Sequence, residues 1–174
     1  REDAEALWSD SLLHLEVTLL REKFLTHAQA LLHGDLHTGS IFITPESTKV
    51  IDPEFAYFGP MGFDIGAVIA NLLLNYAAQE HWSADEAARR DRRAYLLRSA
   101  CEVWTMFDRK FRALWNQNCV DRMARTPGYQ DDYMNRLLQD TIGFAGCKMI
   151  RRIVGLAHVA DIDAIPDAPV RKKA

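Results

Sequence analysis

The stretch His33-Gly34-Asp35-Leu36-His37-Thr38-Gly39-Ser40 is the densest polar cluster in the chain, and it directly follows the short apolar run Ala30-Leu31-Leu32. A second polar segment, Asp52-Pro53-Glu54, directly follows the apolar pair Val50-Ile51. Acidic residues at the mouth of an apolar core are rarely left without partners. A metal ion or a phosphate-bearing substrate would supply such partners for the acids of both segments.

The residues between these two segments predict a small β-hairpin. Ile41-Phe42-Ile43 and Val50-Ile51 are short runs rich in β-branched residues, and Pro45 lies in the turn region between them. Such a hairpin would return the chain on itself. It would therefore bring Asp35 and Asp52 to the same end of the hairpin.

Most of the remaining chain has the pattern of helices. Residues 3–29 repeat apolar side chains at helical spacing, as one helix or as two with a break near residues 9–11. Residues 52–63 are rich in Pro and Gly and predict a loop, whereas the almost wholly apolar segment 64–78 predicts a buried helix. Another helix is predicted over residues 133–159.

A long helix is predicted to run toward residue 118, with Ser83 as its N-cap in a capping box with Glu86. Near the end of the chain, Asp167 and Pro169 have the pattern of a helix start. The inward side of the long helix is expected to carry Leu96, Leu97, Val103, Trp104, Phe107, Phe111 and Leu114.

Composition and charge exclude several classes of protein. With 48% apolar and 26% charged residues, the 174-residue chain is not a disordered one, and its length fits a single domain over residues 1–174. The net charge of −3 argues against a general nucleic-acid binder, and no apolar run is long enough for a membrane span. Three cysteines without a C-x-x-C pair fit thiols in a reducing compartment, so a cytoplasmic protein is expected.

The two polar segments together resemble the catalytic core of the aminoglycoside-phosphotransferase-like small-molecule kinases, which share the protein-kinase fold. Within that superfamily the resemblance is to the 5-methylthioribose kinases, and it spans about residues 30–165. It rests on HGDLHTGSIF (33–42), DPEFA (52–56), GPMGFDIG (59–66) and RRIVGLAHVAD (151–161). The resemblance implies the mainly α-helical C-terminal lobe of such a kinase, with a small β-hairpin.

The resemblance also implies roles for individual residues. Asp35 would be the catalytic residue, which contacts the substrate hydroxyl and accepts its proton. In Asp52-Pro53-Glu54, the two acids would hold Mg²⁺ together with ATP, and the proline would stiffen the loop. Arg151 and Arg152 form an adjacent pair, and at least one of them would reach the sugar and the charge near the transferring phosphate.

Three further residues are expected to support this site. His33 is expected to brace its loop by a hydrogen bond to the backbone. Ser40 stands where many members of the superfamily have a metal-binding Asn, so Glu54 is expected to take more of the metal binding. Asp64, at the start of the buried helix, is expected to cap that helix or to bind the backbone around Asp35.

No glycine-rich phosphate loop, and no strand Lys followed by a helix Glu, occurs before residue 33. Kinases of this fold carry those parts in an N-terminal lobe. The chain is therefore expected to lack the ATP-binding lobe. It is also expected to be truncated at its C-terminus, because it stops shortly after the helix start at Asp167 and Pro169. The implied reaction is ATP-dependent phosphorylation of 5-methylthioribose to its 1-phosphate in methionine salvage, and this lobe alone is expected to be inactive.

Other functions remain open on the sequence alone. One is a related small-molecule kinase for an aminoglycoside, choline or homoserine, although Ser40 and the arginine pair favour methylthioribose. Another is a metal-dependent hydrolase built from His33, Asp35, His37 and Asp52. A third is a lobe used only for interaction, and a homodimer is also open.

Overall fold

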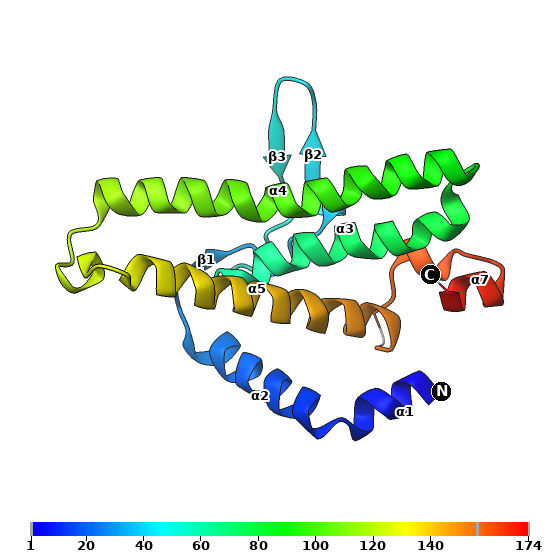
Figure 1. Ribbon diagram of the computed structural model, residues 1–174, viewed down its shortest axis with the longest axis horizontal. Helices are drawn as coiled ribbons and strands as arrows, with labels where there is room; N and C mark the ends of the chain where they lie inside the picture. Colours follow the sequence, from blue (N-terminus) through cyan, green and yellow to red (C-terminus); the bar gives the residue numbers. More distant parts are fainter. Residues whose placement is uncertain (1, 156, 174) are drawn as a thin grey trace.

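The computed structural model describes residues 2–155 and 157–173, most of which are helical (Figure 1). The helices are α1 (Glu2–Ser9), α2 (Ser11–Thr26), α3 (Gly62–Trp82), α4 (Glu86–Asn118), α5 (Tyr129–Ile153), α6 (Ala160–Asp163) and α7 (Ala168–Lys173), with short 3-10 helices η1 (Thr38–Ser40) and η2 (Met123–Arg125). The strands are β1 (Ala30–Leu32), β2 (Ile41–Ile43), β3 (Thr48–Val50) and β4 (Tyr57–Gly59). This is the mainly helical fold with a small hairpin that the sequence predicts.

The first helical segment is divided in two at Asp10. The Asp10 carboxylate accepts the backbone N–H groups of Leu12 and Leu13, both at 3.0 Å, and so caps α2. An aspartate at the N-cap satisfies N–H groups that have no partner within the helix. The chain therefore takes the second of the two predicted arrangements, with a break between α1 and α2.

Helix α3 forms the centre of the structure, because it packs against both α4 and α5 (Figure 1). Small residues on its buried side allow close approach, and a methyl group added at Gly66 would lie 2.6 Å from the carbonyl oxygen of Thr141 on α5. Farther along α3, Leu74 and Ala78 pack with Ile162 of α6. The prediction of a buried helix here is confirmed, and the helix extends beyond the predicted 64–78 at both ends.

The predicted cap of α4 is wrong. Asp85 is the N-cap, and its carboxylate accepts the N–H of Ala88 at 2.8 Å. Ser83 instead ends α3, and its hydroxyl donates to Oε1 of Gln79 at 3.0 Å. The reason is that α3 continues to Trp82, so Ser83 is its C-cap and cannot also start α4. Asp85 then takes the N-cap position, for which aspartate is as suitable as serine.

The predicted inward side of α4 is partly wrong, since Leu97 and Leu114 are 42% and 57% exposed. The residues that face inward form an apolar stripe along the helix at spacings of three and four residues, and these two leucines are not part of it. Beyond the N-terminal end of α3, the stripe meets the start of α5 through aromatic rings (Figure 1), where Phe111 stacks on Tyr133 with centroids 6.1 Å apart. The stripe consists of Leu96, Ala100, Trp104, Phe107, Phe111 and Trp115.

The predicted hairpin is present as β2 and β3, with Ile41 opposite Val50, and it projects from the helical body (Figure 1). The prediction that residues 52–63 form only a loop is wrong, because β4 lies within them and pairs antiparallel with β1. The pairing satisfies backbone groups of two three-residue strands that lie far apart in the sequence. Periodicity within so short a strand does not reveal such a partner.

The last part of the chain contains α5, α6 and α7. The chain turns into α5 at Gly128, whose φ of +84° lies in the left-handed region that favours glycine. Helix α7 begins where the sequence predicts a helix start, since the Asp167 carboxylate accepts the N–H of Val170 at 3.1 Å. Among the described residues, no helix combines the length and apolar character needed to cross a membrane.

Candidate active site

The hairpin brings the two polar segments of the sequence together. The N–H of Ile51 donates to the carbonyl of Ser40 at 3.0 Å, which closes the hairpin at the end opposite its turn. The segment that contains Asp35 leads into β2, and the segment that contains Asp52 leaves β3. Both acids therefore lie in loops at the same end of the hairpin.

The loop around Asp35 is held in place by Asp64, in the first turn of α3. Its carboxylate accepts the N–H groups of His33 at 2.6 Å and of Gly34 at 3.2 Å. Gly34 has a φ of +86°, and a methyl group there would lie 2.1 Å from the carbonyl oxygen of Phe55. The glycine is thus required both by the backbone conformation and by the contact with the second loop.

The His33 ring joins the two loops. Its Nδ1 accepts the N–H of Asp35 at 3.4 Å, and its Nε2 lies 2.8 Å from the carbonyl oxygen of Ile51. Nε2 therefore carries the proton and donates to that carbonyl, directly before Asp52. With both ring nitrogens bound to backbone, His33 is not free to act as a metal ligand in the hydrolase arrangement.

Three basic side chains surround the Asp35 carboxylate. Lys148 Nζ lies 2.5 Å from Oδ1, Arg152 Nη2 lies 3.9 Å from the same oxygen, and His37 Nε2 lies 4.0 Å from Oδ2. Burial opposes ionisation, but the hydrogen bond and charge of Lys148, with the charges of His37 and Arg152, hold the pKa of Asp35 below its ordinary value. Asp35 is therefore an ionised hydrogen-bond acceptor at neutral pH.

The segment Asp52-Pro53-Glu54 presents two exposed carboxylates. The N–H of Ala56 donates to the Pro53 carbonyl at 3.0 Å, so the segment forms a turn. Asp52 has a φ of +65°, the one left-handed non-glycine conformation in the described residues. Within the described part of the chain, no group of three or more His, Cys, Asp or Glu residues could hold a metal ion.

Two carboxylates on one turn nevertheless fit the way in which Mg²⁺ is bound beside a nucleotide. Mg²⁺ usually takes one or two protein carboxylates and fills its remaining positions with phosphate oxygens and water. Asp52 and Glu54 offer hard oxygen ligands of this kind, and neither has a side-chain partner among the described residues. These two residues are thus free to bind a metal ion together with a phosphate-bearing ligand.

The arginine pair lies at the end of α5, and its two members differ in position. Arg152 is half-buried and faces Asp35, and its Nη1 also donates to the carbonyl of Ala157 at 3.3 Å. Arg151 is exposed. Adjacent residues of a helix point about 100° apart, so the structure brings one member of the pair to the site.

Ser40 is buried, and its hydroxyl lies 3.3 Å from Nε2 of His37. His37 in turn accepts the N–H of Gly39 at Nδ1, 3.1 Å away, and caps η1. These contacts are made within the loop itself. Ser40 and His37 therefore shape the segment between Asp35 and β2.

Sequence reasoning missed Lys148, the residue closest to the Asp35 carboxylate. Its side chain is only 5% exposed although it carries an ammonium group. The available signal was its spacing from Arg152, since residues four apart share one face of a helix. The partner carboxylate, however, lies 113 residues away in the sequence.

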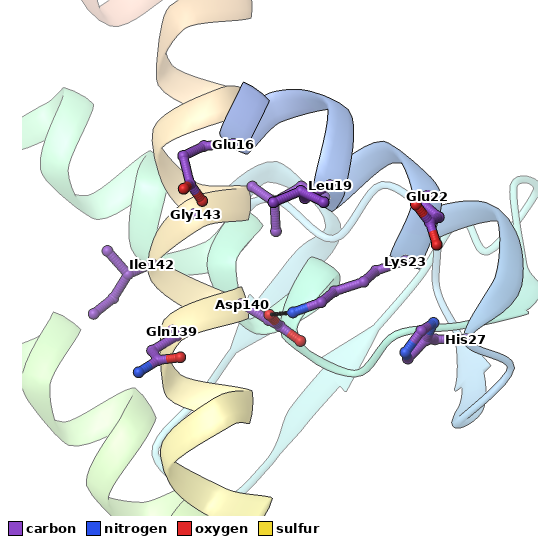
Figure 2. Close-up of a pocket in the computed structure, with 10 residues that line it drawn as sticks. Glu16, Leu19, Glu22, Lys23, His27, Gln139, Asp140, Ile142 and Gly143 are labelled. Carbon is purple, nitrogen blue, oxygen red and sulfur yellow. Dashed lines mark hydrogen bonds and ion pairs between the residues drawn. The ribbon is translucent and has the colours of Figure 1, made fainter. Parts of the chain in front are cut away.

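A separate cavity of about 560 Å³ lies between α2 and α5 (Figure 2). An ion pair between Lys23 and the buried Asp140 spans it and links the two helices. None of the site residues that the sequence predicts is among those that line this cavity. The cavity is thus distinct from the cluster around Asp35.

Comparisons with known proteins show the family to which the chain belongs. The phosphotransferase enzyme family matches residues 1–115 of the chain. A methylthioribose kinase of Geobacillus thermodenitrificans (strain NG80-2) is 52% identical over 94% of the chain, and one of Geobacillus sp. (strain WCH70) is 48% identical over all of it. Methylthioribose kinase 1 of Oryza sativa subsp. japonica is 48% identical over 97% of the chain. The chain spans 39%, 41% and 42% of the lengths of these three relatives, respectively.

Proposed function

Because the chain belongs to the phosphotransferase enzyme family, we propose that it carries the phosphoryl-transfer site of a methylthioribose kinase. The reaction is transfer of the γ-phosphoryl group of ATP to 5-methylthioribose, which gives 5-methylthioribose 1-phosphate and ADP. The observation that supports the proposal is the His33 ring, which binds the Asp35 N–H at one nitrogen and the Ile51 carbonyl, directly before Asp52, at the other.

Asp35 orients the anomeric hydroxyl of the sugar and accepts its proton as the hydroxyl oxygen attacks the γ-phosphorus. Positioning and charge stabilisation provide most of the acceleration in such reactions, so an ionised carboxylate of low pKa is sufficient. The proton is received as the new P–O bond forms and the bond to the β-phosphate oxygen breaks.

Asp52 and Glu54 hold Mg²⁺, with Pro53 fixing the turn between them. When bound, the ion supplies positive charge to the phosphate oxygens. Arg152 is the member of the arginine pair placed to contact sugar hydroxyls or the developing phosphate charge, because it faces the same carboxylate. The proposal rests on Arg152 and not on Arg151, which is exposed.

Residues 1–174 constitute one domain, the helical C-terminal lobe, and a second lobe completes the nucleotide site. Exposed apolar residues of β2 and of the second loop support this division, since Phe42, Ile43 and Phe55 are 59%, 74% and 60% exposed. Exposed apolar side chains of this size are available for contact with a partner. The three cysteines are free thiols, which fits the reducing cytoplasm as the setting of the enzyme.

The test uses a two-lobe protein, in which residues 1–174 replace the matching segment of the Geobacillus thermodenitrificans relative. Turnover with Mg²⁺ and ATP is measured on methylthioribose, an aminoglycoside, choline and homoserine. We expect methylthioribose to be phosphorylated with by far the highest kcat/KM. A preference for one of the other three substrates, or no turnover while the intact relative is active, would contradict the proposed function.

A further inference from the structure

Lys148 is a buried cation that has no role in the proposed mechanism. It lies on α5, its side chain is 5% exposed, and Nζ contacts Oδ1 of Asp35 at 2.5 Å. Nζ also lies 5.8 Å from the centroid of the Phe63 ring on α3. Burial of an ammonium group is costly unless a hydrogen-bonded partner of opposite charge compensates for it. Asp35 is that partner.

The contacts of the two Asp35 oxygens are unequal. Oδ1 receives the hydrogen bond from Lys148 and faces the Arg152 guanidinium at 3.9 Å. Oδ2 faces His37 Nε2 at 4.0 Å, which is beyond hydrogen-bond distance, and has no hydrogen bond from the described residues. One carboxylate oxygen is thus engaged by α5, and the other is free to accept a hydrogen bond.

We propose that Lys148 is a positioning residue for phosphoryl transfer, which holds Oδ1 of Asp35 so that Oδ2 receives the substrate hydroxyl. This role rests on the proposed function. A carboxylate held at one oxygen by a buried side chain cannot rotate freely, and its second oxygen keeps one direction. The gain is in orientation, which accounts for much of the barrier lowering in transfer reactions.

The basic groups that face the Asp35 carboxylate come from two parts of the chain. Lys148 and Arg152 face it from α5, and His37 faces it from the residue before η1. His33 and Asp64 bind the backbone of the same loop rather than its carboxylate. Of these groups, Lys148 is the one within hydrogen-bond distance of the carboxylate. Its removal should therefore change the Asp35 titration more than removal of the Arg152 or the His37 side chain.

The first experiment follows the ¹³C signal of the Asp35 carboxyl by NMR in the 174-residue chain as the pH is lowered. Lys148→Met removes the ammonium and keeps most of the apolar stem, and we expect the Asp35 midpoint to move to higher pH. Lys110→Met, at an exposed position on α4, is the matched control and should leave the midpoint in place. A folded Lys148→Met variant with the wild-type midpoint would overturn the proposal.

The wild-type chain provides a second measurement that does not depend on a variant folding. If the pair forms in solution, the ¹³Cε signal of Lys148 should shift with the same midpoint as the Asp35 carboxyl. A Lys148 signal that does not respond to the titration of Asp35 would overturn the proposal as well. Neither measurement requires ATP or sugar, so both are independent of the proposed function.

The kinetic experiment uses the two-lobe protein. Lys148→Met should lower kcat for methylthioribose about tenfold or more, with a smaller change in KM, and move the acid limb of the pH–kcat/KM profile to higher pH. Lys148→Arg, which keeps the charge, should restore part of the loss. Loss of kcat with an unmoved profile would indicate a purely structural role and would overturn the proposal. If the pair forms but the wild-type two-lobe protein has no turnover, the proposed function has failed and the positioning role fails with it.

Discussion

At the residue scale, the turn at Asp52 has the conformation expected of a site that presents side chains to a ligand. A positive φ at an aspartate costs free energy, and such positions are concentrated at functional sites. The cost is compensated here by contacts of the neighbouring residues, such as the bond from His33 to the Ile51 carbonyl. The two carboxylates are thereby left exposed.

The metal assignment predicts that Asp52→Ala and Glu54→Ala will each abolish Mg²⁺-dependent turnover in the two-lobe protein, because one remaining carboxylate does not position the ion. The measurement is turnover as a function of Mg²⁺ concentration. Glu46→Ala, in the exposed turn of the hairpin, is the matched control and should behave as wild type. Normal activity of Glu54→Ala at ordinary Mg²⁺ would assign the second ligand elsewhere.

A second prediction concerns Tyr57, whose hydroxyl is buried without a hydrogen-bond partner in the described part of the chain. Burial and the Asp64 charge raise the pKa of Tyr57 to about 12. The unfolded chain ionises this tyrosine near pH 10, so its contribution to stability is complete below about pH 10 and is lost as the pH rises toward 12.

Tyr57→Phe removes the hydroxyl and with it this alkaline loss. At pH 8 the free energies of unfolding of wild type and Tyr57→Phe should agree within about 1 kcal/mol. At pH 11 the variant should be the more stable of the two, as measured by urea unfolding. Tyr95→Phe, which removes an exposed hydroxyl, is the control. An equal difference between wild type and Tyr57→Phe at both pH values would contradict the assignment.

Candidate site residues in the local motif could be found from the sequence, and Arg152 through the family resemblance, whereas Lys148 could not. Asp35, Asp52 and Asp64 lie in short segments with many polar and glycine residues, and the neighbours of each aspartate help to indicate its role. Lys148 lies on a helix that looks ordinary in the sequence. Its significance depends on how α5 packs over the Asp35 loop, and this is a property of the tertiary structure.

At the element scale, the close contact between α3 and α5 sets the position of Lys148 and Arg152 relative to the loop that Asp64 holds. Gly66 lies at this contact, and a methyl group there would be 2.6 Å from the Thr141 carbonyl oxygen and 2.9 Å from the Ala145 nitrogen. Both atoms belong to the α5 backbone and cannot move without shifting the helix.

Gly66→Ala should therefore destabilise the chain by about 1–3 kcal/mol, as overpacking of a core does. Gly146→Ala is the matched control, because a methyl group there would contact nothing within 4 Å. In the interior of α5 that change should stabilise by about 0.5–1 kcal/mol. Urea unfolding of both variants checks the prediction, and a harmless Gly66→Ala would mean that the helices are less closely packed than described.

Helices were easier to predict than strands and caps because apolar periodicity acts over many residues. The buried helix α3 and the long helix α4 follow from such patterns. The pairing of β1 with β4 joins two three-residue strands across 24 intervening residues, and no pattern within either strand identifies the other. The choice of Asp85 over Ser83 depended on where α3 ends, which periodicity fixes only to within a few residues.

At the scale of the whole molecule, the described chain contains the proposed base, metal ligands and Arg152, but no glycine-rich loop or strand lysine precedes residue 33 in this sequence. The 174-residue chain should therefore not bind Mg-ATP with micromolar affinity, and calorimetry checks this directly. The two-lobe protein is the positive control. Micromolar binding by the chain alone would place a complete nucleotide site within these residues.

The measurement closest to the proposed chemistry is the turnover of methylthioribose by the two-lobe protein with Asp35→Asn. The substitution keeps the shape of the side chain and removes its charge, so kcat should fall by roughly 10² or more, as general-base contributions do. The affinity for Mg-ATP should change little, because Asp52 and Glu54 are retained. Near-wild-type turnover of Asp35→Asn would contradict the assignment of Asp35 as the residue that receives the substrate proton.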